Sequence, residues 1–215
     1  MRKEFSLVLS VILLLSIMSE AQAITFGFKA GYNFADLIVK PINPGRPQLK
    51  NIQTFSGGFY LAVGFGPFSI QPEFLYTRRG TSFEAYDDSI KYQAEYQLDY
   101  LEGVLLLKWK PLTMGSIKAL VLAGPSFGYL SKARLFVRDE SGVEVGSADS
   151  KDYFKSSELA AVFGAGVEFK LPVLRITVEG RYHLGLSNIA RVEMPNMEVE
   201  SIKNKGYTVM LSLGF

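Results

Sequence analysis

Apolar side chains recur at every second position along most of this 215-residue chain. In residues 24–34, for example, Phe26, Phe28 and Tyr32 share one parity, while Lys29 and Asn33 have the other. A period of two places alternate side chains on opposite faces of a β-strand, whereas a helix repeats every 3.6 residues. The pattern therefore restricts the chain to a sheet whose strands each have one apolar and one polar face.

Eight segments have this pattern: 24–34, 55–65, 68–79, a fourth that ends at 109, 118–130, 158–170, 174–184 and 207–215. Each is about ten residues long, as a tilted strand that crosses a bilayer requires. Short connections at 66–67, 111–116 and 171–173 alternate with long ones at 35–53, 80–95, 131–157 and 187–203. We predict an all-β fold: an eight-stranded antiparallel transmembrane β-barrel with short periplasmic turns, long outer loops and periplasmic termini.

The first 23 residues have the three zones of a secretory signal. Arg2 and Lys3 precede an apolar run at 7–18, and Ala21-Gln22-Ala23 follows as a cleavage site. The apolar run is shorter than the roughly 18 to 20 residues of a membrane-spanning helix. We therefore expect residues 1–23 to be a signal peptide and residues 24–215 to form one barrel domain. The chain has no cysteine, so it has no disulfide framework.

Periodicity alone does not say whether the apolar face of each strand points into the barrel or out of it. A soluble periplasmic carrier has its apolar face inside, and an outer-membrane barrel has it outside. The signal sequence, the terminal Phe215 and the 16 Phe and 11 Tyr residues favour a face in contact with lipid. We expect a protein of the outer membrane of a Gram-negative bacterium. Its net charge of +2 excludes a strongly basic nucleic-acid binder.

The polar faces then carry a set of charges into the lumen. An eight-stranded barrel is just wide enough to be filled by its own side chains, and unpaired buried ions are costly. We expect a lumen charge network that is structural, or that conducts ions in the alternative function of a narrow porin-like channel. When the strands are aligned by their height above the short turns, Glu73 is expected near Lys108, and Glu168 opposite Arg175. Glu179 and Arg181 are expected near Glu102 or Lys29. The network comprises Lys29, Glu73, Arg79, Glu102, Lys108, Glu168, Arg175, Glu179 and Arg181.

The fourth strand interrupts the apolar parity. Tyr96 and Leu98 are even-numbered, whereas Leu101, Leu105 and Leu107 are odd-numbered. Without a correction, the strand would point Glu102 and Lys108 at lipid. We therefore predict a β-bulge at Tyr100 or Leu101, or a strand that starts only there.

Chemistry-bearing motifs are few. His183 is the single histidine, and a rim hydrolase, our third functional reading, would need a partner such as Asp87, Asp88 or Asp99. No cluster has metal-ligand spacing and no glycine-rich segment precedes a helix, so we expect a non-enzymatic protein without a cofactor.

The long loops offer contact surfaces, because recognition residues concentrate on loops held by a rigid scaffold. Lys40, Arg46 and Lys50 lie in a proline-containing basic loop that suits lipopolysaccharide or a partner protein. In the third loop, residues 134–137 and 143–145 flank a hairpin turn whose strand edge is suited to a partner strand. We expect a monomer in outer-membrane lipid, with no nucleic acid.

Six short motifs follow one another along the chain: 26–33 (FGFKAGYN), 71–76 (QPEFLY), 100–108 (YLEGVLLLK), 123–126 (AGPS), 164–168 (GAGVE) and 181–186 (RYHLGL). In these motifs and their order, the chain resembles the PorT-type, porin-like outer-membrane β-barrel family. Where the family usually has a proline after the Glu102 motif, this chain has Gly103 and Val104. The resemblance covers nearly all of residues 24–215, and it implies an eight-stranded barrel and, by analogy, a secretion-apparatus component.

Overall fold

The structure is a computed structural model that describes residues 23–41, 49–87, 90–191 and 199–215. The predicted signal peptide, except for Ala23, lies outside these residues. The elements are β1 (Ala23–Pro41), β2 (Ile52–Phe65), β3 (Phe68–Asp87), β4 (Ile90–Met114), β5 (Ile117–Arg138), β6 (Glu144–Asp149), η1 (Lys151–Tyr153), β7 (Ser157–Lys170), β8 (Arg175–Gly185) and β9 (Val199–Gly214).

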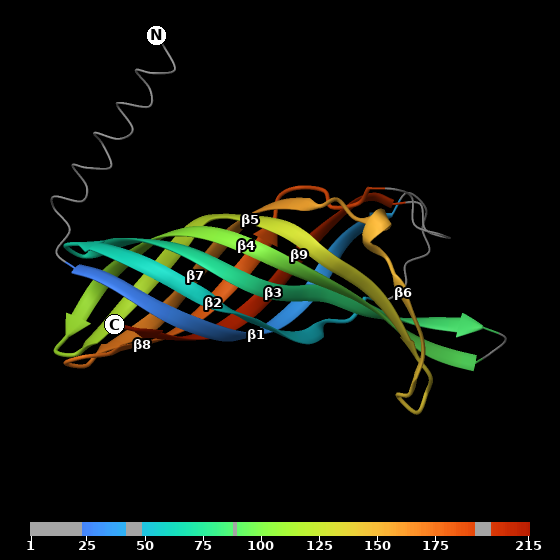
Figure 1. Cartoon of the computed structure of the whole chain (residues 1–215), viewed down its shortest axis with the longest axis horizontal. Helices are drawn as coiled ribbons and strands as arrows, with labels where there is room; N and C mark the ends of the chain where they lie inside the picture. The colour runs from blue at the N-terminus through green and yellow to red at the C-terminus, as the bar shows by residue number, and fades with distance from the viewer. Residues whose placement is uncertain (1–22, 42–48, 88–89, 192–198) are drawn as a thin grey trace, which may run out of the picture.

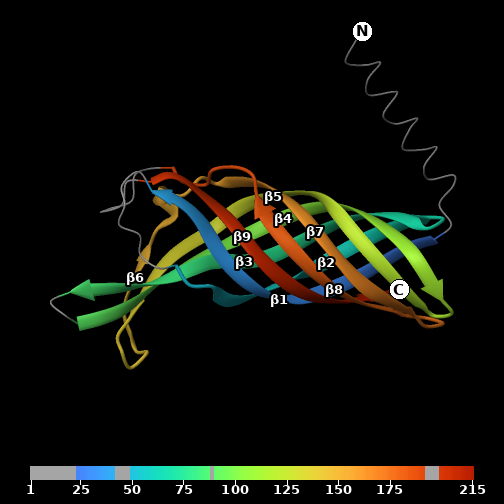
Figure 2. The same ribbon diagram turned by 180° about the vertical axis from the view of Figure 1, so that it is seen from behind.

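Eight of these strands form a closed ring (Figures 1 and 2). Their order is β4-β3-β2-β1-β9-β8-β7-β5, every neighbouring pair is antiparallel, and pairing of β4 with β5 closes the ring. β1 pairs with β9, so the two ends of the barrel domain lie side by side. The predicted eight-stranded antiparallel barrel is confirmed. The short strand β6 pairs with β5 beyond the ring.

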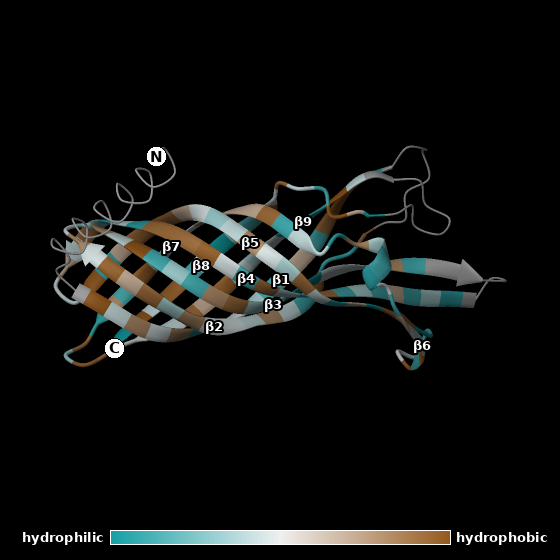
Figure 3. Cartoon of the chain, turned by 45° about the horizontal axis from the view of Figure 1, so that its top comes forward, coloured by the Kyte–Doolittle hydropathy of each residue, from teal (hydrophilic) through white to brown (hydrophobic). Residues whose placement is uncertain are grey.

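The apolar faces of the strands point outward, as predicted. Phe28 is 56% exposed whereas the next residue, Lys29, is 4% exposed. The same alternation gives the barrel wall its stripes of hydrophobic and hydrophilic residues (Figure 3). Within the described ranges, no helix is both long and apolar enough to cross a membrane.

Strand pairing continues well past the segments that the apolar pattern marked. β1 extends to Pro41, and β3 and β4 stay paired up to Asp87 and Ile90. The prediction that 35–53, 80–95 and 131–157 are loops is therefore wrong for much of their length. Backbone hydrogen bonds do not need apolar side chains, so strands continue into water where the lipid-facing pattern ends. At the other end, the turn after β4 contains Gly115 at φ +58°, and it is shorter than the predicted 111–116.

The predicted bulge in β4 is also wrong. Tyr96, Leu98 and Tyr100 do not face lipid: the side chains of Leu98 and Tyr100 are fully buried inside the barrel. β4 thus keeps one parity throughout, and its pairing with β3 is continuous through this region. The register with β5 does shift between Asp99 and Tyr100, but the extra residue is Ser131 of β5.

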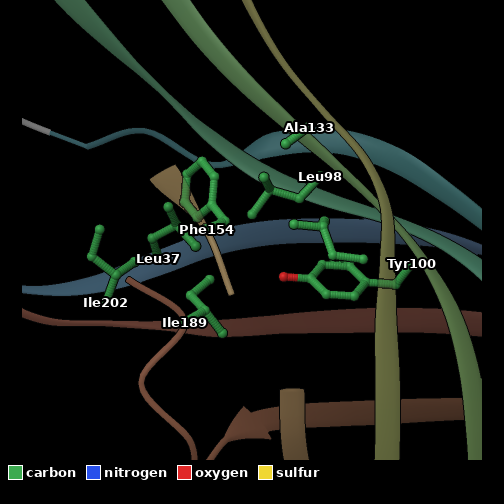
Figure 4. Close-up of a cluster of buried hydrophobic side chains, with 8 residues drawn as sticks. Leu37, Leu98, Tyr100, Ala133, Phe154, Ile189 and Ile202 are labelled. Carbon is green, nitrogen blue, oxygen red and sulfur yellow. The ribbon is translucent and has the colours of Figure 1, made fainter. Parts of the chain in front are cut away.

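These inward apolar residues belong to a hydrophobic plug near the outer end of the barrel (Figure 4). Phe154, which follows η1, and Ile189 pack into it from connecting segments, so chain outside the ring covers this end of the lumen. The buried members of the plug are Leu37, Leu98, Tyr100, Leu130, Ala133, Phe154, Ile189 and Ile202.

Candidate functional site

Five charged side chains meet inside the periplasmic half of the barrel, and we call them the lower charge cluster. They are Lys29 of β1, Glu73 of β3, Lys108 of β4, and Glu179 and Arg181 of β8. All five are buried. Each lies on the polar parity of its strand, so the alternation itself directs them into the lumen.

The contacts of this cluster are mostly shared. Lys29 Nζ lies 2.5 Å from Glu73 Oε1 and 3.5 Å from Glu179 Oε2. Arg181 donates from Nη1 to Glu73 Oε2 at 2.7 Å and from Nε to Glu179 Oε2 at 2.9 Å. Lys108 donates to Glu179. Each of the two carboxylates therefore contacts at least two of the three cations, and such pairing offsets part of the desolvation cost of buried ions.

A second group, the upper charge cluster, lies closer to the outer end. It consists of Arg79, Glu102, Glu158 and His183. Arg79 Nη2 donates to both carboxylate oxygens of Glu102, at 2.9 and 2.7 Å, and Nη1 donates to Glu158 Oε2 at 3.2 Å. Asn204 also donates to Glu158 Oε2, at 3.0 Å.

The contacts of His183 define its tautomer. Its Nδ1 lies 3.0 Å from Arg79 Nη2, and a guanidinium has only donors, so Nδ1 accepts this hydrogen bond. The proton of a neutral ring is then on Nε2, which faces Glu158 Oε1 at 3.4 Å. His183 thus connects the Arg79 guanidinium to the Glu158 carboxylate.

A group of apolar side chains, which we call the apolar layer, packs inside the barrel beside both clusters. It consists of Leu75, Val104, Leu106, Leu120, Leu122, Val162 and Met210. A cavity lined by residues of both clusters and another at the periplasmic end each have a volume of about 30 Å³, which is enough to hold a water molecule. From the periplasm outward, the lumen is thus filled by the lower charge cluster, the upper charge cluster and the plug, with the apolar layer packed beside the two charge clusters.

Several pairings differ from those expected by strand height. Glu73 pairs with Lys29 and Arg181 rather than with Lys108. Glu168 lies near the periplasmic end, where its carboxylate contacts Lys110 at 2.8 Å and Lys118 at 4.0 Å, and Arg175 only lines the cavity beside it. Height ranks residues along each strand, but it does not say how far a long side chain reaches across the lumen.

Glu179 and Arg181 do lie with Lys29, one of the two places expected for them, whereas Glu102 belongs to the other cluster. Sequence reasoning missed Glu158. It shares the parity of Glu168 on the same strand, and this signal was present in the sequence.

The basic loop residues are only partly described. Lys40 is exposed on β1, and Lys50 is exposed and paired with Glu84 at 2.6 Å. Arg46 lies outside the described residues. Lys50 also forms a bridge with Ser82, so it belongs to the extended sheet rather than to a free loop.

Among the described residues, the pairing of His183 with Asp99 expected for a rim hydrolase is not formed. His183 is buried in the lumen, while Asp99 lies on the outward face and is held by Arg78 at 2.6 Å. Asp88 and the side chain of Asp87 lie outside the described part. No group of three potential metal ligands occurs among the described residues.

Comparison with solved structures finds other outer-membrane barrels. Neisserial surface protein A is 13% identical, with 90% of this chain and 100% of that one covered and a TM-score of 0.46. The outer membrane protease OmpT from Escherichia coli is 11% identical, with coverages of 90% and 96% and a TM-score of 0.44. The translocator domain of the autotransporter NalP from Neisseria meningitidis is 10% identical, with coverages of 100% and 96% and a TM-score of 0.37.

No protein with a curated description matches the sequence. A family profile described as "Outer membrane protein beta-barrel domain" matches residues 19–191, which is most of the chain. The profile match agrees with the closed ring and its apolar exterior, and it places the protein in the outer membrane of a Gram-negative bacterium. The chain belongs to the outer membrane protein beta-barrel domain family.

Proposed function

We propose that this protein is a non-enzymatic outer-membrane barrel of the PorT type that acts by binding a partner protein with the part of the barrel beyond the outer leaflet. The filled lumen is the observation that carries the proposal. A solute or ion on the barrel axis meets two buried charge clusters, an apolar layer and a plug. Displacing paired buried ions costs several kcal/mol per ion, so transport through the lumen is disfavoured.

The extended strands supply a surface for contact. β3, β4, β5 and β6 continue as a sheet beyond the ring, seen at one end of Figure 1. The turn between β5 and β6 is fixed by Asp139, whose Oδ1 accepts from the backbone N–H groups of Ser141 and Val143. Gly142 has φ +79°, which favours glycine. The hairpin predicted from residues 134–145 is thus present, and hydrogen bonds to Asp139 hold its turn.

The outer edge of β6 suits a β-strand from another protein. Its residues are largely exposed, and in the described chain β6 pairs only with β5. Val143 and Val145 are 59% and 55% exposed, so an added strand finds apolar side chains as well as free backbone groups. The resemblance to PorT-type barrels supports a partner within a secretion apparatus in the envelope, by analogy.

Site-specific photo-crosslinking in intact cells tests this proposal. A crosslinking residue replaces Val145 in one variant and Lys170, exposed at the periplasmic end of β7, in the control. We expect an adduct with one discrete protein from position 145 that is absent from position 170. A folded, surface-exposed barrel that gives no adduct from position 145 would contradict the proposal.

The non-enzymatic character has a separate test. We expect the purified barrel to leave fluorogenic peptide and ester substrates intact. Hydrolysis that is abolished by His183→Ala in a folded barrel would show that the enzymatic alternative is correct.

A further inference from the structure

A basic cleft lies on the outward wall of the barrel, separate from the lumen and from the β6 edge. It has a volume of about 190 Å³ and is lined by residues of β3, β4 and β5. This volume is several times the roughly 30 Å³ that a water molecule occupies in the liquid. Its main lining residues are Tyr76, Arg78, Asp99, Lys132, Arg134 and Phe136, and we call it the outer basic cleft.

Exposed tyrosine and apolar side chains on the periplasmic side of the cleft indicate its height relative to the membrane. Tyr76, Leu101 and Tyr129 are aligned across β3, β4 and β5, and the last two are 40% and 49% exposed. Such a row of exposed tyrosine and apolar residues marks the interface at the edge of the lipid-facing band.

The next outward row, Arg78, Asp99 and Lys132, is likewise in register. It lies two residues further along tilted strands, or about 5 to 7 Å from the first row. The short turns place this end of the barrel outside the cell, so the cleft is at the depth of the outer-leaflet headgroups.

Two of its cations remain available. Arg78 binds Asp99 through Nε and Nη2, at 2.6 and 3.1 Å, and contacts the hydroxyl of Tyr76 at 3.3 Å. Lys132 and Arg134 are exposed, and neither has a carboxylate within 4.0 Å in the described residues.

The surrounding charges leave an excess of positive charge. Asp149 is the strand neighbour of Arg134, and its Oδ1 accepts from the backbone N–H of Lys151. The side chain of Lys151 lies beside the same wall, where its Nζ donates to the backbone oxygen of Ser131 at 3.1 Å. The four cations Arg78, Lys132, Arg134 and Lys151 therefore outnumber the carboxylates of Asp99 and Asp149.

We propose that the outer basic cleft binds a phosphate group of an outer-leaflet lipid headgroup, with Lys132 and Arg134 as its direct ligands. Arginine and lysine are the side chains that bind phosphate oxygens through charge-assisted hydrogen bonds. Arg78 remains paired with Asp99 and forms part of the cleft wall next to Lys132 and Arg134. Tyr76 and Phe136 supply apolar walls for the glycan or acyl part of the lipid. The site is independent of the proposed function, because it faces the bilayer rather than the β6 edge.

Binding of diphosphorylated lipid A to the refolded full chain in detergent micelles, measured by titration calorimetry, tests the proposal. Lys132→Ala combined with Arg134→Ala removes both ligands. We expect about tenfold weaker binding or more, because the variant loses both charge-assisted ligands of the phosphate. The matched control is Lys203→Ala with Lys205→Ala, which removes two outward-facing lysines from β9, opposite β4 in the ring. We expect the control to bind as the wild type does.

Further measurements distinguish a lipid headgroup from free phosphate and verify that the variants are folded. We expect dephosphorylated lipid A to bind the wild type as weakly as diphosphorylated lipid A binds the cleft variant, and inorganic phosphate at equal concentration not to compete. Equal binding by the cleft variant and the wild type would overturn the proposal, as would full competition by inorganic phosphate. Heat-modifiable gel mobility verifies that each variant is folded, and Arg134→Lys, which keeps the charge, is expected to retain most of the affinity.

Discussion

Replacing Glu179 by Gln is expected to lower the free energy of unfolding of the barrel. Glu179 is fully buried and accepts hydrogen bonds from Lys29, Lys108 and Arg181. Glutamine keeps the shape but removes the charge, so three buried cations are left with Glu73 as their only carboxylate in the lower charge cluster. Breaking a buried ion pair on one side costs about 3 to 5 kcal/mol, and we expect this loss in the free energy of unfolding.

Urea unfolding in phospholipid vesicles measures this loss, and Trp109, the single tryptophan, reports the transition by its fluorescence. The control is Glu144→Gln on the exposed strand β6, for which we expect a change within about 0.5 kcal/mol. Adding Lys108→Met to Glu179→Gln removes the lysine that has lost its carboxylate partner. We therefore expect a coupling energy of about 1 to 3 kcal/mol between the two changes. A loss below about 1 kcal/mol for Glu179→Gln alone would refute the reasoning that these charges depend on one another.

Gly124→Ala is expected to destabilise the barrel by about 2 kcal/mol or more in the same assay, because the new Cβ would lie 1.9 Å from the backbone oxygen of Leu105. Gly103→Ala, with 4.0 Å to its nearest neighbour, is the control and is expected to be nearly neutral. Hydrogen bonds from Lys50, the larger cause, and from Lys91 hold the pKa of Glu84 at about 2, below its ordinary 4.5. The stabilising effect of this pairing is therefore present above pH 4.5 and is lost as the pH falls through about 2, which an NMR titration of the Glu84 carboxyl checks by its midpoint. Leu98→Ala in the plug is expected to cost about 2 to 5 kcal/mol in urea unfolding.

The barrel itself could be predicted from the sequence because alternation, strand length and turn spacing all depend on the membrane. Residues such as Phe28 and Lys29 differ in parity, and parity alone decides which one meets lipid. Hydrophobicity led the prediction astray at Leu98, where an apolar residue was taken as lipid-facing although it fills the outer end of the lumen. Parity was the better guide there than hydrophobicity.

The ion pairs were less predictable than the membership of the network. Strand parity places Glu73 and Lys108 inside, but the partner of each depends on the reach and direction of long side chains across the lumen. The outer basic cleft was not foreseen at all. Arg78, Asp99 and Lys132 come from three strands, and they align only through a register that includes the bulge at Ser131.

The central claim is that the lumen is closed, so that function is exerted outside it. Single-channel recording of the purified barrel in planar bilayers tests this most directly. Because two charge clusters, an apolar layer and a plug occupy the axis, we expect no steady conductance, and none in Glu102→Gln. A steady, ion-selective conductance of the wild type that vanishes in Glu102→Gln would contradict the account and establish the barrel as a narrow channel.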